Sequence, residues 1–184
     1  MDEKTIREEL LKIVKEKAFQ KGDYTLSSGK KSSYYFDGKQ VTLHPQGILL
    51  LGKTILAMLQ GVTAEAIGGP TLGADPIATA VSLLSSQTGR PLKAFIVRKE
   101  EKKHGTQKRI EGPKLEKGER VVVVEDVITS GKSVMEAISE IEKLGCRVVK
   151  VICLVDREEG ADQLLSPYNF SPIFTKTELG PRPD

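Results

Sequence analysis

The stretch "VVVVEDVITSGKS" at residues 121–133 decides the fold that this sequence predicts. Its run of valines predicts a buried strand, because β-branched side chains favour extended structure. The two acids and the small polar residues that follow predict a turn and then the start of a helix. Such a junction is where α/β proteins bind phosphorylated ligands, since backbone amides and the helix dipole favour an anion there. The stretch therefore predicts an α/β fold with an anionic ligand.

Strand and helix patterns alternate on either side of this stretch. Strand-like runs occupy residues 64–69, 92–97, 147–156 and the region of 171–176, and helical patterns occupy 48–59, 74–89 and 133–144. An amphipathic helix begins the chain, and residues 24–38 suggest two short strands around a Ser/Gly/Lys turn. This alternation predicts a mostly parallel central sheet flanked by helices, with ligands at the carboxyl ends of its strands.

Composition narrows the class of protein. The chain has 184 residues, the size of one domain, so we expect residues 1–184 to form a single domain. Its amino terminus lacks the apolar segment of a secretory signal, and its longest apolar run, residues 47–59, is too short to span a bilayer. Cys146 and Cys153 lie in or beside strand-like sequence, which predicts buried thiols and fits a reducing cytoplasm. A net charge of +3 with 5% aromatic residues argues against a nucleic-acid partner.

The polar turn has to be compared with the phosphate loop of nucleotide triphosphatases, G-x-x-x-x-G-K-[ST]. The letters "GKS" at residues 131–133 match the end of that pattern. Its first glycine, however, would fall on Asp126, and with Glu125 this residue would place negative charge beside the phosphates of the ligand. The triphosphatase interpretation is therefore rejected.

The same turn still suits a phosphate. Its residues Thr129, Ser130, Gly131, Lys132 and Ser133 offer hydroxyls, an ammonium group and backbone amides at a helix start. The preceding acids suit the hydroxyls of a diol and can help to hold a divalent metal, directly or through water. Phosphate, diol and metal together describe a ribose 5-phosphate that carries more phosphate at C1. The motif taken alone leaves open a second interpretation, an acidic strand end with a polar helix cap.

Residues 121–133 resemble the phosphoribosyl pyrophosphate (PRPP) motif of type I phosphoribosyltransferases: a hydrophobic strand, two acids and T-[SA]-G-x-[ST]. This motif does not name the acceptor base. Other stretches do: "FQKGDYTLSSGKKSSYYFD" at 19–37, "RKEEKKHG" at 98–105 and "LVDREEG" at 154–160 resemble the signatures of orotate phosphoribosyltransferases, in family order. The chain thus resembles that family over most of its length.

The resemblance implies a role for each matching residue. Glu125 and Asp126 would hold the ribose hydroxyls, and the turn from Thr129 to Ser133 would wrap the 5-phosphate. The orotate carboxylate would face Arg157, which can bind both of its oxygens, and the position of Thr129 also reaches orotate. Tyr35 and Phe36 match an aromatic pair that borders the base in the family. The alternative interpretation is that they are ordinary core residues of the hairpin.

The charged segment at residues 98–118 lies between two strands and has no apolar periodicity. The cations of this segment match the catalytic loop of the family: Arg98, Lys99, Lys102 and His104. The resemblance therefore implies a long mobile loop. It also implies that the catalytic residues are Lys99, Lys102 and His104 of this loop and Asp126 of the PRPP motif. A solvated charge run is the usual interpretation of such a sequence. Position between two core strands favours the loop instead.

The resemblance implies further properties of the protein. Residues 1–40 and the C-terminal segment would form a small hood beside the sheet. The reaction would join orotate to PRPP in the synthesis of UMP, giving orotidine 5′-monophosphate and pyrophosphate, with Mg²⁺ held mainly by PRPP. The family also implies a cytoplasmic homodimer in which loop 98–118 reaches the neighbouring active site.

Two positions depart from the family pattern. Many relatives have lysine where this chain has Ser27 and Gly73, and both lysines would add positive charge near the substrates. Two rival functions also deserve weight. A PRPP-binding regulator usually adds a DNA-binding domain and lacks the catalytic loop, whereas a purine phosphoribosyltransferase should lack the context of Arg157 and the "TLSSGKKSSYY" signature. Both fit this chain less well.

Overall fold

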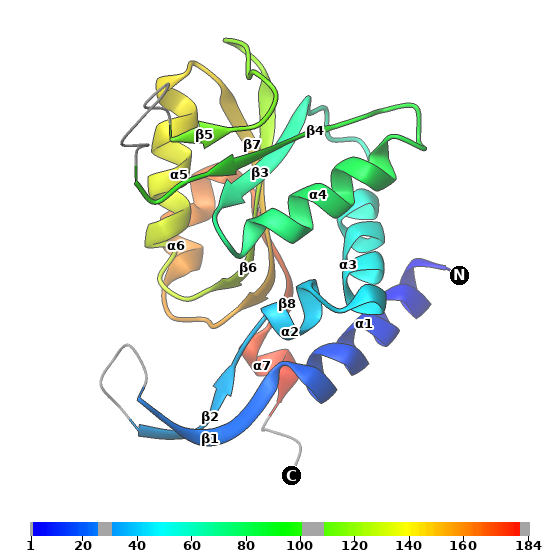
Figure 1. Cartoon of the computed structure of the whole chain (residues 1–184), viewed down its shortest axis with the longest axis vertical. Coiled ribbons are helices and arrows are strands. Elements are labelled where there is room, and N and C mark those ends of the chain that lie inside the picture. Colours follow the sequence, from blue (N-terminus) through cyan, green and yellow to red (C-terminus); the bar gives the residue numbers. More distant parts are fainter. Residues whose placement is uncertain (1, 26–30, 101–108, 181–184) are drawn as a thin grey trace.

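A computed structural model of the chain describes residues 2–25, 31–100 and 109–180. Its centre is a six-stranded sheet in the order β5-β4-β3-β6-β7-β8, in which every neighbouring pair is parallel except β4 and β5 (Figure 1). The strands are β3 (Ala66–Pro70), β4 (Lys93–Val97), β5 (Ile110–Glu111), β6 (Arg120–Ile128), β7 (Arg147–Asp156) and β8 (Phe170–Thr175). The prediction of a mostly parallel α/β sheet is confirmed.

Helices cover both faces of this sheet (Figure 1). They are α1 (Glu3–Lys17), α2 (Lys39–Thr42), α3 (Pro45–Met58), α4 (Ala74–Ser85), α5 (Lys132–Lys143), α6 (Ala161–Leu165) and α7 (Lys176–Leu179), with the 3-10 helix η1 (Ser166–Tyr168) after α6. The short helices α2 and α7 were not expected from the sequence. The longer ones lie where the hydrophobic periodicity predicts them, although α3 begins earlier, at Pro45, where Nδ1 of His44 accepts a hydrogen bond from the Gly47 amide at 3.2 Å.

The valine run of β6 explains why the sheet is buried on both faces. Val121 and Val123 belong to the core cluster under α5 and α6, whereas Val122 and Val124 belong to the cluster under α1, α3 and α4. Successive side chains of a strand point to opposite faces, so an unbroken apolar run is what a strand between two helical layers requires. All four valines are fully buried.

A separate two-stranded hairpin stands beside this core. It consists of β1 (Phe19–Thr25) and β2 (Lys31–Phe36), which pair antiparallel with Phe19 opposite Phe36. The rings of Phe19 and Phe36 meet edge to face with their centroids 5.2 Å apart, and both pack against the main core cluster. Figure 1 shows the hairpin projecting away from the central sheet. The expected pair of strands is therefore confirmed, and the first begins earlier than predicted.

The segment at residues 98–118 contains ordered structure that its charged composition concealed. Ile110 and Glu111 form β5, which pairs antiparallel with the end of β4, and Leu115 is buried in the cluster under α5. Lys102 and His104 lie outside the described residues.

The structure also bears on the predictions about the two cysteines and about membrane-spanning segments. Cys146 and Cys153 are both buried and form no disulfide, which confirms the prediction of buried thiols, and burial raises the pKa of each thiol. Within the described ranges, no helix combines the length and the apolar character needed to cross a bilayer.

Candidate active site

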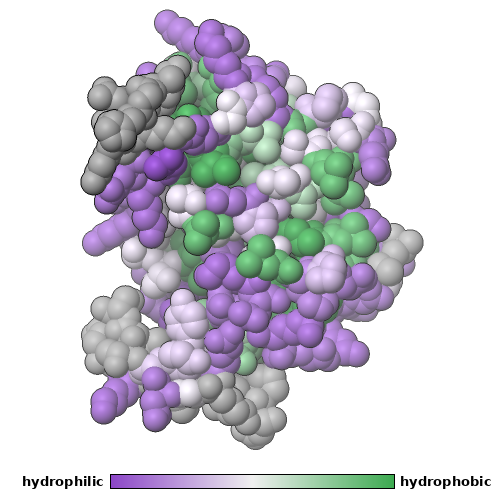
Figure 2. All heavy atoms as spheres, in the orientation of Figure 1, coloured by the Kyte–Doolittle hydropathy of each residue, from purple (hydrophilic) through white to green (hydrophobic). Residues whose placement is uncertain are grey.

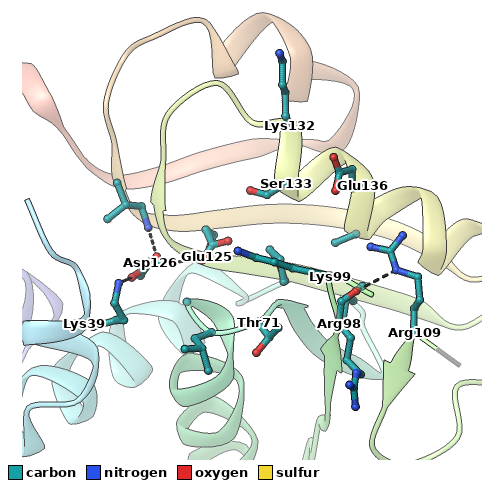
Figure 3. Close-up of a pocket in the computed structure, with 16 residues that line it drawn as sticks. Lys39, Thr71, Arg98, Lys99, Arg109, Glu125, Asp126, Lys132, Ser133 and Glu136 are labelled. Carbon is teal, nitrogen blue, oxygen red and sulfur yellow. Dashed lines mark hydrogen bonds and ion pairs between the residues drawn. The ribbon is translucent and has the colours of Figure 1, made fainter. Parts of the chain in front are cut away.

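A cavity of about 800 Å³ opens at the carboxyl ends of β3, β4 and β6, beside the start of α5 (Figure 3). Its lining comprises Lys39, Pro70, Thr71, Leu72, Gly73, Val97, Arg98, Lys99, Arg109, Glu125, Asp126, Val127, Lys132, Ser133, Glu136 and Ala137. Parallel strands point their carboxyl ends to one edge of a sheet, so residues that are distant along the chain meet there. The cavity thus unites the acid pair, the polar turn and the start of the charged segment.

Glu125 and Asp126 form the acidic side of the cavity. Each is only 7% exposed. The Asp126 amide donates a hydrogen bond to Oε1 of Glu125 at 3.0 Å, and the Val127 amide donates to Oδ1 of Asp126 at 2.7 Å. Burial raises the pKa of Glu125 well above its ordinary value of 4.5, and the adjacent Asp126 carboxylate adds to the effect. This pair can accept hydrogen bonds from a diol, and it favours a proton or a cation beside it.

The polar turn after β6 brings the amino terminus of α5 to the same cavity. Gly131 has a φ of 78°, a left-handed conformation that glycine adopts without strain, and it precedes the first residue of the helix. Lys132 and Ser133 line the cavity, whereas Thr129 and Ser130 of the same turn are not part of its lining. In Figure 3, Ser133 lies toward Glu125 and Lys132 extends away from the acids. Free backbone amides at this helix start suit an anion.

Two glycines leave room for the acids. A Cβ added to Gly73, in the turn between β3 and α4, would overlap Oε1 of Glu125 and come within 2.5 Å of Oδ1 of Asp126. A Cβ added to Gly38, before α2, would lie 3.0 Å from Oδ2 of Asp126. The backbone therefore approaches the carboxylates closely from both sides, and neither position accepts a side chain without displacing them. This gives a physical reason for glycine at position 73.

The basic side of the cavity combines expected and unexpected residues. Arg98 and Lys99 follow β4 and line the cavity as the sequence predicted. Sequence reasoning missed Arg109, which precedes β5, and Lys39, which reaches Asp126 on the acidic side of the cavity from the start of α2. It also missed Glu136 of α5.

No local pattern marked the missed residues. The fold of the chain brings these residues to the cavity, and no sequence motif indicated that they would lie there. Thr71 differs from these, because it lies within the "GGPTLGAD" stretch at a strand end, and its hydroxyl donates to Oδ2 of Asp75 at 2.8 Å.

The expected base-binding residues lie outside the lining of this cavity. Arg157 directly follows β7, where its amide donates to the Ile128 carbonyl at 2.9 Å and its Nε lies 3.4 Å from Oε1 of Glu159. Tyr35 is 39% exposed and its ring lies 5.5 Å from that of Tyr24, whereas Phe36 packs on Phe19. Both aromatic residues therefore pack against other rings of the hairpin, and Tyr35 remains exposed.

With this geometry established, comparison with known proteins is informative. Residues 68–174 match the phosphoribosyl transferase domain model. An orotate phosphoribosyltransferase from a Nostoc species is 48% identical over 183 residues, covering 98% of this chain and 88% of the relative. The chain belongs to the orotate phosphoribosyltransferase family. An Aquifex aeolicus member is 45% identical, over 94% of this chain and 95% of its own.

Solved structures agree with this family membership. The orotate phosphoribosyltransferase of Mycobacterium tuberculosis, solved with PRPP, superposes with a TM-score of 0.79 at 34% identity, covering 95% of this chain and 99% of that one. An adenine phosphoribosyltransferase from Thermoanaerobacter pseudethanolicus gives a TM-score of 0.66 at 17% identity, covering 91% of this chain and 98% of that one, which shows the shared fold alone.

Proposed function

We propose that the protein transfers the 5-phosphoribosyl group of PRPP to orotate, giving orotidine 5′-monophosphate and pyrophosphate in the synthesis of UMP. One observation carries this proposal: the buried pair Glu125 and Asp126 opens into the same cavity as the amino terminus of α5. A buried diol acceptor beside an anion site suits a ribose phosphate. Relatives in the same family are orotate phosphoribosyltransferases, and the one from M. tuberculosis was solved with PRPP.

The acid pair would bind the two ribose hydroxyls, and the turn of residues 129–133 would bind the 5-phosphate. Support for the second role comes from the left-handed Gly131 and from Ser133, which faces the acids across the cavity. A phosphate there would accept hydrogen bonds from the backbone amides at the start of α5. With both ends of the ribose held, C1 is presented toward Arg98 and Lys99 on the basic side.

The chemical step would break the bond between C1 and the pyrophosphate oxygen and form a bond from C1 to the ring nitrogen of orotate, while the proton of that nitrogen passes to the departing pyrophosphate or to water. Because the first bond breaks early, the transition state resembles an oxocarbenium ion and the departing pyrophosphate gains negative charge. Lys99, at the mouth of the cavity, would stabilise that charge together with Lys102 and His104, and Asp126 would hold the ribose while it flattens. Charges aimed at the departing group lower the barrier most, since they act most strongly in the transition state.

Orotate would bind on the side of the hairpin. Arg157 is the expected partner of its carboxylate, and its present contact with Glu159 is a single ion pair at 3.4 Å on a partly exposed side chain, which a planar carboxylate can replace. Thr129, Tyr35 and Phe36 would complete this region. We place the hood that covers it in residues 1–40 and the C-terminal segment, with residues 1–184 forming a single domain.

The ligand atoms that the cavity offers can be compared with those that Mg²⁺ prefers. Carboxylate oxygens are the ligands that this ion prefers, and Glu125 and Asp126 supply them at the cavity. Across residues 2–25, 31–100 and 109–180, however, no group of three or more acidic, histidine or cysteine side chains gathers to hold a metal. The residues therefore fit an ion that takes most of its ligands from PRPP, with these two acids helping directly or through water. Such an ion would neutralise charge on the departing pyrophosphate.

We further propose a cytoplasmic homodimer in which loop 98–118 serves the neighbouring active site. Large exposed leucines support an interface: Leu72, in the turn beside the cavity, is 70% exposed, and Leu43 and Leu83 are similarly open. Figure 2 shows apolar side chains gathered among polar ones on the face that carries α4.

One assay separates the rival functions. The protein is incubated with PRPP, Mg²⁺ and either orotate, hypoxanthine or adenine, while ultraviolet absorbance and pyrophosphate release are followed. We expect turnover with orotate alone. Turnover of a purine without orotate would support the purine enzyme instead, and PRPP binding without turnover of any base would support the regulator.

A further inference from the structure

Lys39 occupies an unusual place between two acids. Its Nζ lies 2.9 Å from Oδ1 of Asp37 and 3.6 Å from Oδ2 of Asp126. Figure 3 shows its side chain directed toward Asp126 from the first turn of α2, opposite the charged segment that follows β4. Among the residues that the structure describes, Lys39 is the basic side chain that forms an ion pair with the acidic side of the cavity.

Asp37 holds the lysine in this position. Its Oδ1 also accepts a hydrogen bond from the Lys39 amide at 3.1 Å, its Oδ2 accepts one from Gln40 at 3.2 Å, and its own amide donates to the Ala18 carbonyl at 2.8 Å. Burial alone would lower the pKa of Lys39, but the hydrogen bond to Asp37 and the charge of Asp126 outweigh it and raise that pKa. The ammonium group is therefore charged and anchored to the end of α1.

The cavity needs such a cation. Glu125 and Asp126 lie side by side with little exposure, and PRPP brings several further negative charges to the same place. Like charges in a partly buried site repel strongly, because little water remains to screen them. At position 73 of this chain there is no side chain, and one built there would require the Glu125 carboxylate to shift, so the positive charge reaches Asp126 from the other side, past Gly38.

We propose that Lys39 is a positioning residue for the reaction: it holds the Asp126 carboxylate in place for the ribose and offsets its charge when PRPP binds. This inference rests on the proposed function. Lys39 precedes both the catalytic-loop motif and the PRPP motif in the sequence. Its contact with Asp126 links the start of α2 to the end of β6, where the ribose would bind. Lys39 acts through Asp126 and does not itself contact the reacting atoms.

Kinetic constants of variants test this role, after the wild type has been shown to turn over orotate. We expect Lys39→Met to raise the KM for PRPP by roughly 10- to 100-fold, because a charged hydrogen-bond partner is lost, while the KM for orotate changes less than threefold. Lys39→Arg should recover most of the loss, since it restores the charge. Asp37→Asn should give a smaller rise in the same constant, because it only loosens the lysine.

The matched control is Lys12→Met, which removes a lysine that pairs with Glu16 at 3.9 Å on the exposed face of α1. It should leave both KM values unchanged. If Lys39→Met does not fold, Lys39→Gln and Asp37→Asn carry the same measurement. An active wild type with unchanged PRPP constants in the folded Lys39 variants would overturn the positioning role, as would Lys39→Arg behaving like Lys39→Met. An inactive wild type would instead overturn the proposed function.

Discussion

Arg98 and Arg109 are joined by two hydrogen bonds, which hold together the two ends of the segment between these residues. The Arg98 amide donates to the Arg109 carbonyl at 2.8 Å, and Nε of Arg109 donates to the Arg98 carbonyl at 3.0 Å. Arg109 also reaches Glu140 of α5, with Nη1 3.2 Å from Oε1. The two ends of the segment between Arg98 and Arg109 are thereby fixed to each other and to α5.

Replacing Arg109 by alanine should loosen this connection. We expect Arg109→Ala to lower kcat by about tenfold, since misplaced catalytic groups cost rate even when the chemistry is intact, with a smaller effect on the KM for orotate. Steady-state kinetics measure both. Lys114→Ala is the control, because its pairing with Glu116 lies on an exposed surface. Equal kinetics for Arg109→Ala and the wild type would show that the paired ends do not position the segment.

A methyl group at position 73 is predicted to displace the Glu125 carboxylate from its present position. Gly73→Ala should weaken PRPP binding by at least about tenfold, since the new Cβ would push against Glu125 and Asp126. Isothermal titration with PRPP and Mg²⁺ measures the change. Gly52→Ala serves as a control, because its Cβ would meet the flexible end of Leu84 away from the cavity. Unchanged PRPP affinity in Gly73→Ala would contradict the close packing of the turn on the acids.

Glu125 should make the ligand-free protein less stable as pH rises. Its pKa in the folded state is raised above the ordinary 4.5, chiefly by burial, so the folded state binds more protons than the unfolded state just above pH 4.5. The free energy of unfolding therefore falls as pH rises from 4.5 through the raised pKa. Glu125→Gln removes this dependence and the unfavourable buried charge.

Thermal unfolding from pH 4.5 to 8 tests this prediction. We expect the Tm of Glu125→Gln to exceed that of the wild type by a few degrees at pH 8, since an uncompensated buried polar group costs about 1–3 kcal/mol, and the difference should shrink toward pH 4.5. PRPP turnover should be strongly reduced in the same variant. A Tm difference independent of pH would mean that Glu125 does not titrate in this range.

Arg157 should determine the affinity for orotate rather than for PRPP. Arg157→Ala is expected to raise the KM for orotate by roughly 10- to 100-fold, because each charge-assisted hydrogen bond contributes about 1.5–3 kcal/mol, and to leave the KM for PRPP within a few-fold. Glu159→Gln removes the ion-pair partner and should leave orotate binding intact. A rise confined to the PRPP constant would assign Arg157 to the other substrate.

Sharing of the active site between subunits is tested by mixing two impaired chains. A Lys102→Ala chain lacks a loop cation and an Arg157→Ala chain lacks the orotate partner, so a heterodimer would contain one site with neither defect. We expect activity to reappear, up to about one intact site in two, when differently tagged chains are co-purified. Heterodimers that are no more active than the parent chains would indicate that each loop serves its own subunit.

Local sequence patterns were enough to predict much of the fold and part of the candidate site. The valines of β6 predict burial on both faces, because an unbroken β-branched run has no polar side to show to water. The acids and the small polar turn after them predict a ligand site, because a strand end followed by a helix start exposes amides. These local patterns were enough to indicate the sheet, the hairpin and the phosphoribosyltransferase family.

Only the tertiary structure decided which distant residues meet. Lys39 lies outside the quoted signatures, yet it contacts Asp126 because the path of the chain brings α2 to the end of β6. Ile110 lies in a charged segment and becomes a strand because the edge of β4 offers it a partner. Local patterns encode burial and turns, whereas contacts between distant segments depend on how the packed elements close on one another.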